Sequence, residues 1–387
     1  MYRHRQSKTR SALHRVNRFS GDEQKATEGD RRSFATRALR FAGTATLIAA
    51  LMLLAGCAEE QADPQREQRQ LLGTNSVITI YDSSFPDDAF ERYFERVEEI
   101  QNKMSINEAE YDDTEVLKIN RNAGVEPVQV SDDTFFVISE GKRWAEITNG
   151  LFDISVQPLI RLWDIGGPDE QVPSEEDREE ALSLINYEEI ELNESENTVY
   201  LPREGMGLDV GGIAKGYAVD EITRMMREDG IERAIIDFGG DLYNIGTRPD
   251  GTPWRIGIQH PSGRRQELLG VITSSDEAVV TSGPYERYFE EDGTRFHHIF
   301  DIRTGAPSDS ELVSATVIGA DAIGADVLST AIFVMGLEDG YALIEDLEDY
   351  EAVFADEQGG VYATAGVRED VEVRAEDFEL RDHSSVD

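Results

Sequence analysis

Cysteine is nearly absent from this sequence, because Cys57 is the only one among 387 residues. A single cysteine can form no internal disulfide. Lysine is also scarce, with six residues in all and four after Cys57. Histidine is equally sparse after that point, so the adjacent pair His297 and His298 stands out.

Basic residues are few in comparison with acidic residues. The sequence holds 37 basic and 78 acidic residues, for a net charge of −41. Without residues 1–56 the balance is 26 basic against 74 acidic, or −48. Duplex nucleic acid requires a basic footprint, so we expect no nucleic-acid partner. A lysine-poor, acid-rich chain is typical of proteins exposed to high salt, and a merely acidic surface is the alternative interpretation.

The N-terminal segment has the pattern of a bacterial export signal. Arg31-Arg32-Ser-Phe34 precedes an apolar run at 41–55, and Leu54-Ala-Gly-Cys57 follows it. This pattern predicts a lipoprotein signal peptide at 1–56, and an uncleaved membrane anchor is the alternative. We expect Cys57 to carry a lipid that anchors the protein to a bacterial membrane, facing the periplasm. The paired arginines leave open whether export follows the twin-arginine route, and we expect residues 57–70 to form a flexible tether.

The remainder of the chain, 71–387, is expected to form the folded domain. Its hydrophobic periodicities predict an α+β fold rather than a regular alternation of strand and helix. Helices are expected at 87–104, 134–149, 213–228 and 322–336, strands at 75–81, 234–238, 254–259, 268–274 and 313–319, a hairpin at 189–201, two strands within 351–365, and a loop at 169–177.

A glycine-rich segment, Asp209-Val-Gly-Gly-Ile-Ala-Lys-Gly-Tyr-Ala-Val-Asp220, stands at a predicted strand-to-helix junction. Glycine lets the backbone approach a ligand closely, and a helix start presents free N–H groups that suit a phosphate. Lys215 adds a cation. The spacing matches neither the dinucleotide-binding nor the P-loop pattern, so a plain tight turn is the alternative.

The predicted helix at 322–336 is apolar on nearly every side, which indicates burial. Its polar exceptions, Asp326, Ser329 and Thr330, share one helical face. A buried carboxylate is costly unless it is paired or bound to a metal. Carboxylate and hydroxyl oxygens suit Mg²⁺, and a capped or salt-bridged structural aspartate is the alternative.

Several motifs in one order extend these observations. They are Asn149-Gly-Leu-Phe-Asp153, the glycine-rich segment, Thr281-Ser-Gly-Pro-Tyr-Glu-Arg-Tyr288, His297-His-Ile-Phe-Asp301 and Ala325-Asp-Val-Leu-Ser-Thr330. Over residues 72–366 the chain resembles the ApbE family, the FAD:protein FMN transferases. The resemblance implies helices packed on a mainly antiparallel sheet. It also implies a reaction that splits FAD, esterifies FMN to a threonine of a target protein and releases AMP. Subunits of membrane redox complexes are the expected targets.

The resemblance also implies roles for individual residues. His298 is the expected catalytic base, and Mg²⁺ is expected on the Gly212 carbonyl, Asp326, Ser329 and Thr330. The expected contacts to FAD are Leu72, Asn107, Leu151, Phe152, Asp153, Asp209, Lys215 and Phe300. A turn cap is the alternative role for Asp209, and a solvated helix-start lysine is the alternative for Lys215. On a strand, His297 and His298 would point to opposite faces.

Two positions depart from the family pattern. Leu72 stands where methionine is usual, and Asn107 stands where many members have an aromatic residue. An asparagine cannot stack on a ring of FAD. This keeps open a second activity, an FAD pyrophosphatase that gives FMN and AMP. A non-catalytic flavin-binding lipoprotein is a third possibility, against which the joint presence of Asp326, Thr330 and His298 argues.

Overall fold

The computed structural model describes residues 63–262 and 267–383. The signal segment 1–56 and Cys57 lie outside the described residues, so the export and lipidation predictions stay predictions. Within the described ranges, none of the helices combines the length and the apolar character needed to cross a membrane.

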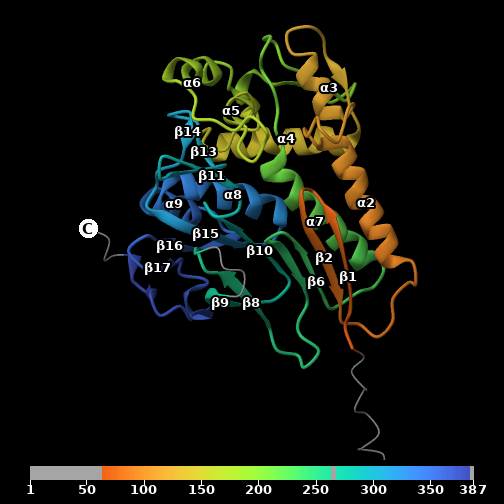
Figure 1. Ribbon diagram of the computed structural model, residues 1–387. Helices are drawn as coiled ribbons and strands as arrows, with labels where there is room; N and C mark the ends of the chain where they lie inside the picture. Colours follow the sequence, from red (N-terminus) through yellow and green to blue (C-terminus); the bar gives the residue numbers. More distant parts are fainter. Residues whose placement is uncertain (1–62, 263–266, 384–387) are drawn as a thin grey trace, which may run out of the picture. The chain divides into compact units, whose positions relative to one another are not determined.

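A nine-stranded sheet runs through the described chain in the order β1-β2-β6-β7-β10-β15-β16-β17-β19 (Figure 1). Neighbouring strands are antiparallel except β17 and β19, which are parallel. The strands are β1 (Gln65–Leu71), β2 (Thr74–Ile80), β6 (Ala234–Phe238), β7 (Asp241–Ile245), β10 (Glu277–Ser282), β15 (Leu312–Gly319), β16 (Tyr350–Asp356), β17 (Gly360–Ala363) and β19 (Glu379–Leu380). The expected α+β fold with a mainly antiparallel sheet is confirmed.

The middle strands of this sheet are buried on both faces, because their side chains alternate between two apolar cores. In β10, Ala278 and Val280 belong to the larger core and Val279 to the smaller one. The larger core contains α7 (Gly211–Glu228) and α8 (Ala322–Met335). The smaller core lies under a three-stranded sheet, β18-β9-β8. Its strands are β8 (Trp254–Gln259), β9 (Leu268–Ser274) and β18 (Val371–Val373).

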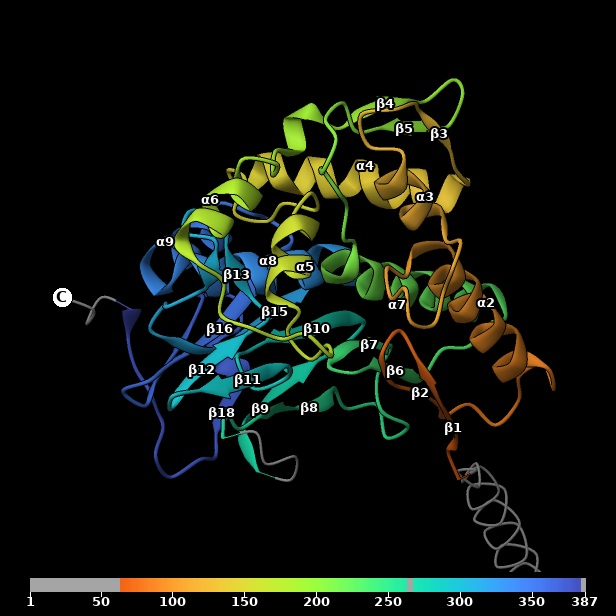
Figure 2. The ribbon, with the colours of Figure 1, turned by 45° about the horizontal axis from the view of Figure 1, so that its top comes forward.

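A second layer of helices covers α7. The helices α2 (Ala89–Met104) and α4 (Asp132–Ile147) both contact α7 (Figure 2). Arg96 of α2 links the three helices, since its guanidinium lies 2.7 Å from Asp133 of α4 and 2.9 Å from Glu221 of α7. This network fixes α7, whose N-terminal end carries the glycine-rich segment.

Smaller elements complete the described chain. They are α3 (Glu115–Arg121), α5 (Gln157–Trp163), α6 (Glu175–Leu182), α9 (Leu337–Glu345), the 3₁₀ helices η1 (Tyr187–Glu189) and η2 (Arg368–Asp370), and the strands β3 (Val128–Gln129), β4 (Glu191–Asn193), β5 (Thr198–Tyr200), β11 (Tyr288–Glu291), β12 (Thr294–His297), β13 (Phe300–Asp301) and β14 (Ala306–Pro307).

The expected flexible tether at 57–70 is wrong for its last six residues. Residues Gln65–Leu71 form β1, which pairs along its whole length with β2. The strand lies at the edge of the sheet and is largely exposed, so its sequence shows no apolar alternation. The positive φ angles of Leu72 and Gly73 make the turn into β2.

The expected loop at 169–177 is wrong for its last three residues. The helix α6 begins at Glu175, and the side chain of its N-cap residue, Ser174, accepts a hydrogen bond from the Asp177 backbone N–H. Acidic residues in this first turn complement the positive end of the helix.

Candidate active site

The glycine-rich segment does begin a helix, at Gly211, two residues earlier than expected. Its glycines permit two close contacts. A side chain at Gly216 would meet the Ala322 carbonyl oxygen at 2.3 Å, so this glycine allows α7 to touch the start of α8. A side chain at Gly212 would meet the Phe152 ring at 3.1 Å. The segment is therefore packed between α8 and the 149–153 stretch.

Asp209 stands just before this helix start. Its Oδ1 accepts a hydrogen bond of 2.6 Å from the Gly211 backbone N–H, which is the turn-cap geometry. Burial raises the pKa of the Asp209 carboxyl, and the nearby charge of Arg287 acts in the opposite direction. Within the described part of the chain the second oxygen of Asp209 accepts no backbone hydrogen bond, so capping and ligand binding are compatible.

Asp326 of α8 faces the first turns of α7 and is almost fully buried. Its Oδ2 accepts a 3.1 Å hydrogen bond from the Gly216 backbone N–H, and its Oδ1 lies 3.4 Å from Lys215 Nζ. In a regular α-helix the Gly216 N–H would donate to the Gly212 carbonyl. The Gly212 carbonyl oxygen and the Asp326 carboxylate therefore share the Gly216 N–H as a donor. The Gly212 carbonyl oxygen can thus accept a further partner.

Sequence reasoning missed Asp241, the first residue of β7. Its Oδ2 lies 2.6 Å from Lys215 Nζ, and its exposed fraction is 3%. Burial and the charge of Asp326 raise the pKa of Asp241 well above its usual value. Burial would lower the pKa of Lys215, but the two carboxylates outweigh that effect and raise it. The only signal in the sequence is the hairpin glycine pair before Asp241, since both glycines have positive φ.

Three hydroxyl groups form a cluster at the part of α8 that carries Asp326. Ser282 Oγ lies 2.8 Å from Ser329 Oγ and 3.3 Å from Thr330 Oγ1. Ser329 also donates to the Asp326 backbone carbonyl, and it has no exposed surface. Thr330 is only partly buried. Ser329 thus holds the cluster together through its hydrogen bonds to Ser282 and to the Asp326 carbonyl. Thr330 and Asp326 offer hard oxygen donors of the kind that Mg²⁺ prefers.

The two adjacent histidines have different surroundings. His297 is buried, with Nε2 3.0 Å from the Ser308 carbonyl oxygen and Nδ1 3.3 Å from the Ile299 backbone N. His298 is partly buried, and its Nδ1 lies 3.2 Å from the Arg287 carbonyl oxygen. A carbonyl only accepts, so this contact assigns the proton of neutral His298 to Nδ1 and leaves Nε2 as a proton acceptor.

The pKa of His298 is lowered to about 4, first by burial and then by the charge of Arg287. Lys215 contributes in the same direction. Near neutral pH the imidazole is therefore uncharged, which is the form that a general base requires.

Arg287 is the second residue that sequence reasoning did not assign, although its motif was recognised. Its Nη2 would lie 3.0 Å from a Cβ at Gly73, so the guanidinium rests on the turn between β1 and β2. Its charge reaches both Asp209 and His298. Among residues 63–262 and 267–383, no carboxylate forms a salt bridge with Arg287. An exposed cation whose charge reaches His298, as that of Lys215 does, suits an anionic ligand.

The other expected FAD contacts divide into two groups. Leu72 and Phe152 lie beside the site: the Leu72 N–H donates to Gln101 Oε1 next to the Arg287 contact, and the Phe152 ring packs on Gly212. Leu151, which precedes Phe152, is partly buried and packs against the larger core. Asp153, Asn107 and Phe300 do not join it through any hydrogen bond or ion pair among the described residues.

Each member of that second group has a local role. Asp153 is buried and accepts hydrogen bonds from Ser155 and from the Tyr187 backbone N–H. Exposed Asn107 caps its own turn by accepting from the Ala109 N–H. Phe300 packs on Trp163, with ring centroids 5.9 Å apart.

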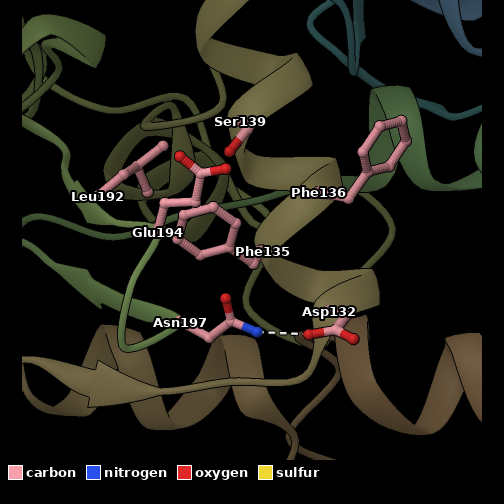
Figure 3. Close-up of a pocket in the computed structure, with 7 residues that line it drawn as sticks. All are labelled: Asp132, Phe135, Phe136, Ser139, Leu192, Glu194 and Asn197. Carbon is pink, nitrogen blue, oxygen red and sulfur yellow. Dashed lines mark hydrogen bonds between the residues drawn. The ribbon is translucent and has the colours of Figure 1, made fainter.

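A depression of ≈ 560 Å³ lies elsewhere, between α4 and the β4–β5 hairpin (Figure 3). Its lining residues are Asp132, Phe135, Phe136, Ser139, Leu192, Glu194 and Asn197. The charged groups here are Asp132 and Glu194, and Asp132 is hydrogen-bonded to Asn197. An acidic lining without a cation does not suit a phosphate, so this depression is not the candidate site.

Comparison with known proteins gave concordant results. The ApbE family model matches residues 72–354. The FAD:protein FMN transferase of Klebsiella pneumoniae (strain 342) is 37% identical over 284 residues, which cover 73% of this chain and 86% of that protein. The FAD:protein FMN transferase of Treponema pallidum (strain Nichols) is 30% identical over 316 residues, or 78% of this chain and 87% of that protein.

Solved structures match as well. The ApbE protein of Thermotoga maritima has a TM-score of 0.72 and 33% identity, over 79% of this chain and 98% of that chain. A histidine-to-glycine mutant of the flavin transferase ApbE from Vibrio cholerae has a TM-score of 0.69 and 31% identity, also over 79% and 98%.

Proposed function

This chain belongs to the ApbE family, and from that membership we propose that it is an Mg²⁺-dependent FAD:protein FMN transferase. It moves FMN from FAD to a threonine hydroxyl of a target protein and releases AMP. The relatives in Klebsiella and Treponema carry this name.

The observation that supports this proposal most strongly is the grouping of two cations with one base. The charges of Lys215 and Arg287 both act on His298, whose Nε2 is an open acceptor. FAD carries a diphosphate, which needs positive charge on both phosphates as its bond breaks. The incoming hydroxyl needs a proton acceptor within hydrogen-bond reach. One site supplies both requirements.

The reaction follows from these roles. The threonine Oγ attacks the phosphorus on the FMN side of the diphosphate, and a new O–P bond forms. The P–O bond to the AMP moiety breaks, and AMP leaves with the bridging oxygen. His298 Nε2 accepts the hydroxyl proton. Lys215 and Arg287 hold the phosphate oxygens, so the reacting groups stay aligned.

The Asp326 carboxylate, the Thr330 hydroxyl and the Gly212 carbonyl, with Ser329 behind them, would hold Mg²⁺, which when bound supplies positive charge to the phosphate oxygens. Among the expected FAD contacts, Leu72, Phe152 and Asp209 lie next to these residues, and Leu151 adjoins Phe152 in the chain. Asp153 fits a supporting role, because its carboxylate is already bonded to backbone and hydroxyl donors.

Export, lipidation at Cys57 and a periplasmic location remain part of the proposal. A target among membrane redox proteins would be consistent with such an anchor. Mass spectrometry of the protein purified from a bacterial host tests it. We expect a lipidated N-terminal Cys57 in the wild type and none in Cys57→Ser, and an identical unlipidated mass for both would contradict the lipid anchor.

Asn107 favours a second candidate activity, hydrolysis of FAD to FMN and AMP. Its exposed amide caps its own turn and offers no ring for stacking. Incubation with FAD and Mg²⁺, with and without a threonine-containing target peptide, separates the two activities. Release of AMP that depends on the peptide supports transfer, whereas release at the same rate without peptide supports hydrolysis. Binding of FAD without any AMP would contradict both.

A further inference from the structure

The Lys215 ammonium has two carboxylate neighbours at different distances. Nζ lies 2.6 Å from Asp241 Oδ2 and 3.4 Å from Asp326 Oδ1. The shorter distance is that of a strong, charge-assisted hydrogen bond, and the longer one is near the limit for any hydrogen bond. Asp241 therefore makes the short, strong contact with the ammonium, and Asp326 makes the longer and weaker one.

Asp241 is a fixed point in the fold. As the first residue of β7 it pairs with Phe238 of β6 on one side and Val280 of β10 on the other. The β6–β7 turn is closed by Gly239 and Gly240, where a side chain on Gly239 would collide with Thr74. The helix α7 contacts β7 (Figure 2), and Lys215 lies in the first turns of this helix. Lysine has a flexible four-carbon stem, so the strand sets where the ammonium lies.

The position of the ammonium matters for Asp326. A lysine bonded directly to Asp326 Oδ1 would repel a divalent cation at the same oxygen. The other oxygen, Oδ2, already accepts from the Gly216 N–H. By holding Lys215 to one side, Asp241 keeps the contact between the ammonium and Asp326 Oδ1 long and weak, so a metal ion can compete for this oxygen.

We propose that Asp241 is a positioning residue that holds Lys215 beside Asp326, so that a divalent metal ion can compete for the Asp326 carboxylate. This proposal rests on the metal-binding part of the proposed function. It assigns Asp241 no contact with the metal, because its near oxygen is occupied by Lys215.

Mn²⁺ binding to the purified full-length protein, measured by electron paramagnetic resonance without FAD, tests this proposal. Asp241→Asn should weaken Mn²⁺ binding by about tenfold or more, the range seen when a group that orients a metal ligand is removed. Lys215→Met should bind Mn²⁺ at least as tightly as the wild type. The double variant Asp241→Asn/Lys215→Met should recover the affinity of Lys215→Met, since no ammonium is left to occupy Asp326.

Two results would overturn the proposal while leaving the metal site intact. One is wild-type affinity in Asp241→Asn. The other is a double variant as weak as Asp241→Asn, which would make Asp241 a direct metal ligand. Asp356→Asn is the matched control, because this carboxylate is equally buried three strands away in the same sheet, and it should bind Mn²⁺ normally. Equal Mn²⁺ binding by the wild type and Asp326→Ala would refute the metal site itself and the present proposal with it.

Discussion

At the scale of single residues, identical side chains acquire different chemistry from their surroundings. His297 and His298 are neighbours in the sequence, yet both ring nitrogens of His297 are engaged by the backbone. His298 has one engaged nitrogen, Nδ1, against the Arg287 carbonyl. Only His298 can therefore accept a proton from a substrate without losing a structural hydrogen bond.

The first prediction follows from this difference. His298→Asn should lower kcat by a factor of about 10²–10⁴, the usual contribution of a general base. The KM for FAD should change little, because His298 is neutral and binds no phosphate. Steady-state kinetics with a target peptide measure both constants. His297→Asn should act through stability instead, seen as a lower melting temperature, and equal losses of kcat in the two variants would contradict the assignment.

Arg287 should act on substrate binding. Arg287→Gln removes a cation from the site, and one charge-assisted hydrogen bond corresponds to about tenfold in affinity. We expect the Kd for FAD, measured by flavin fluorescence, to rise by at least that factor. Arg295→Gln is the control, since Arg295 lies on the same hairpin but pairs with Glu290 and covers the Tyr288 ring. Equal Kd values for Arg287→Gln and the wild type would remove Arg287 from the site.

The raised pKa of Asp220 predicts that the stability of the protein depends on pH. It accepts hydrogen bonds from the Ala322 and Ile323 N–H groups at the start of α8, and burial, with the charge of Asp321, raises its pKa to about 7. A folded-state pKa above the unfolded one means that the native state retains the proton. Its stability should therefore fall as pH rises from about 4 to about 7, by up to about 1.4 kcal/mol per pH unit.

Asp220→Asn does not titrate, so it isolates this effect. The free energy of unfolding of the wild type, compared with that of the variant, should decline across this pH window. Urea titrations at several pH values measure it. Parallel pH profiles for the two proteins would show that Asp220 does not titrate in this range.

At the scale of elements, strongly patterned segments were predictable from the sequence. The strands at 234–238, 254–259 and 268–274 have the expected bounds, because their apolar residues either alternate with less buried ones or form a continuous buried run. The edge strand β1 was not predictable, since it is stabilised by backbone pairing with β2 and not by an apolar face. The start of α6 was not predicted, because prolines precede its N-cap residue and are typical of loops.

The candidate site was predictable in part. Lys215, Asp326 and Thr330 could be found because two helices carry polar residues against an apolar or glycine-rich background. Asp241 could not, because a hairpin aspartate is an ordinary turn residue until the sheet brings it next to Lys215. The burial of Ser329 and the local role of Asp153 also depend on packing that no local pattern reports.

The contact between α7 and α8 gives a prediction at this scale. Gly216→Ala should destabilise the protein by about 1–3 kcal/mol, the cost of overpacking, because the added methyl meets the Ala322 backbone carbonyl. Chemical denaturation measures the change. Glu228→Ala on the exposed end of the same helix is the control and should stay within about 0.5 kcal/mol of the wild type. An unchanged unfolding free energy in Gly216→Ala would contradict the close contact between α7 and the start of α8.

At the scale of the whole molecule, the negative charge is the dominant property. The net charge of −48 after residue 56 implies strong self-repulsion, which salt screens over a Debye length of about 10 Å at 0.1 M and about 3 Å at 1 M. The melting temperature and the affinity for FAD should both rise from low to molar NaCl at saturating Mg²⁺. Thermal melts and FAD titrations across a salt series test this, and a melting temperature that stays flat or falls would contradict adaptation to brine.

The proposed transferase activity is tested most directly by mass spectrometry of a threonine-containing target peptide after incubation with the protein, FAD and Mg²⁺. The account predicts one FMN phosphoester on the threonine and one AMP released for each modified peptide. The same peptide with valine in place of threonine should stay unmodified, as should the threonine peptide incubated with Asp326→Ala. Free FMN and AMP in equal amounts, with no modified peptide, would contradict the account.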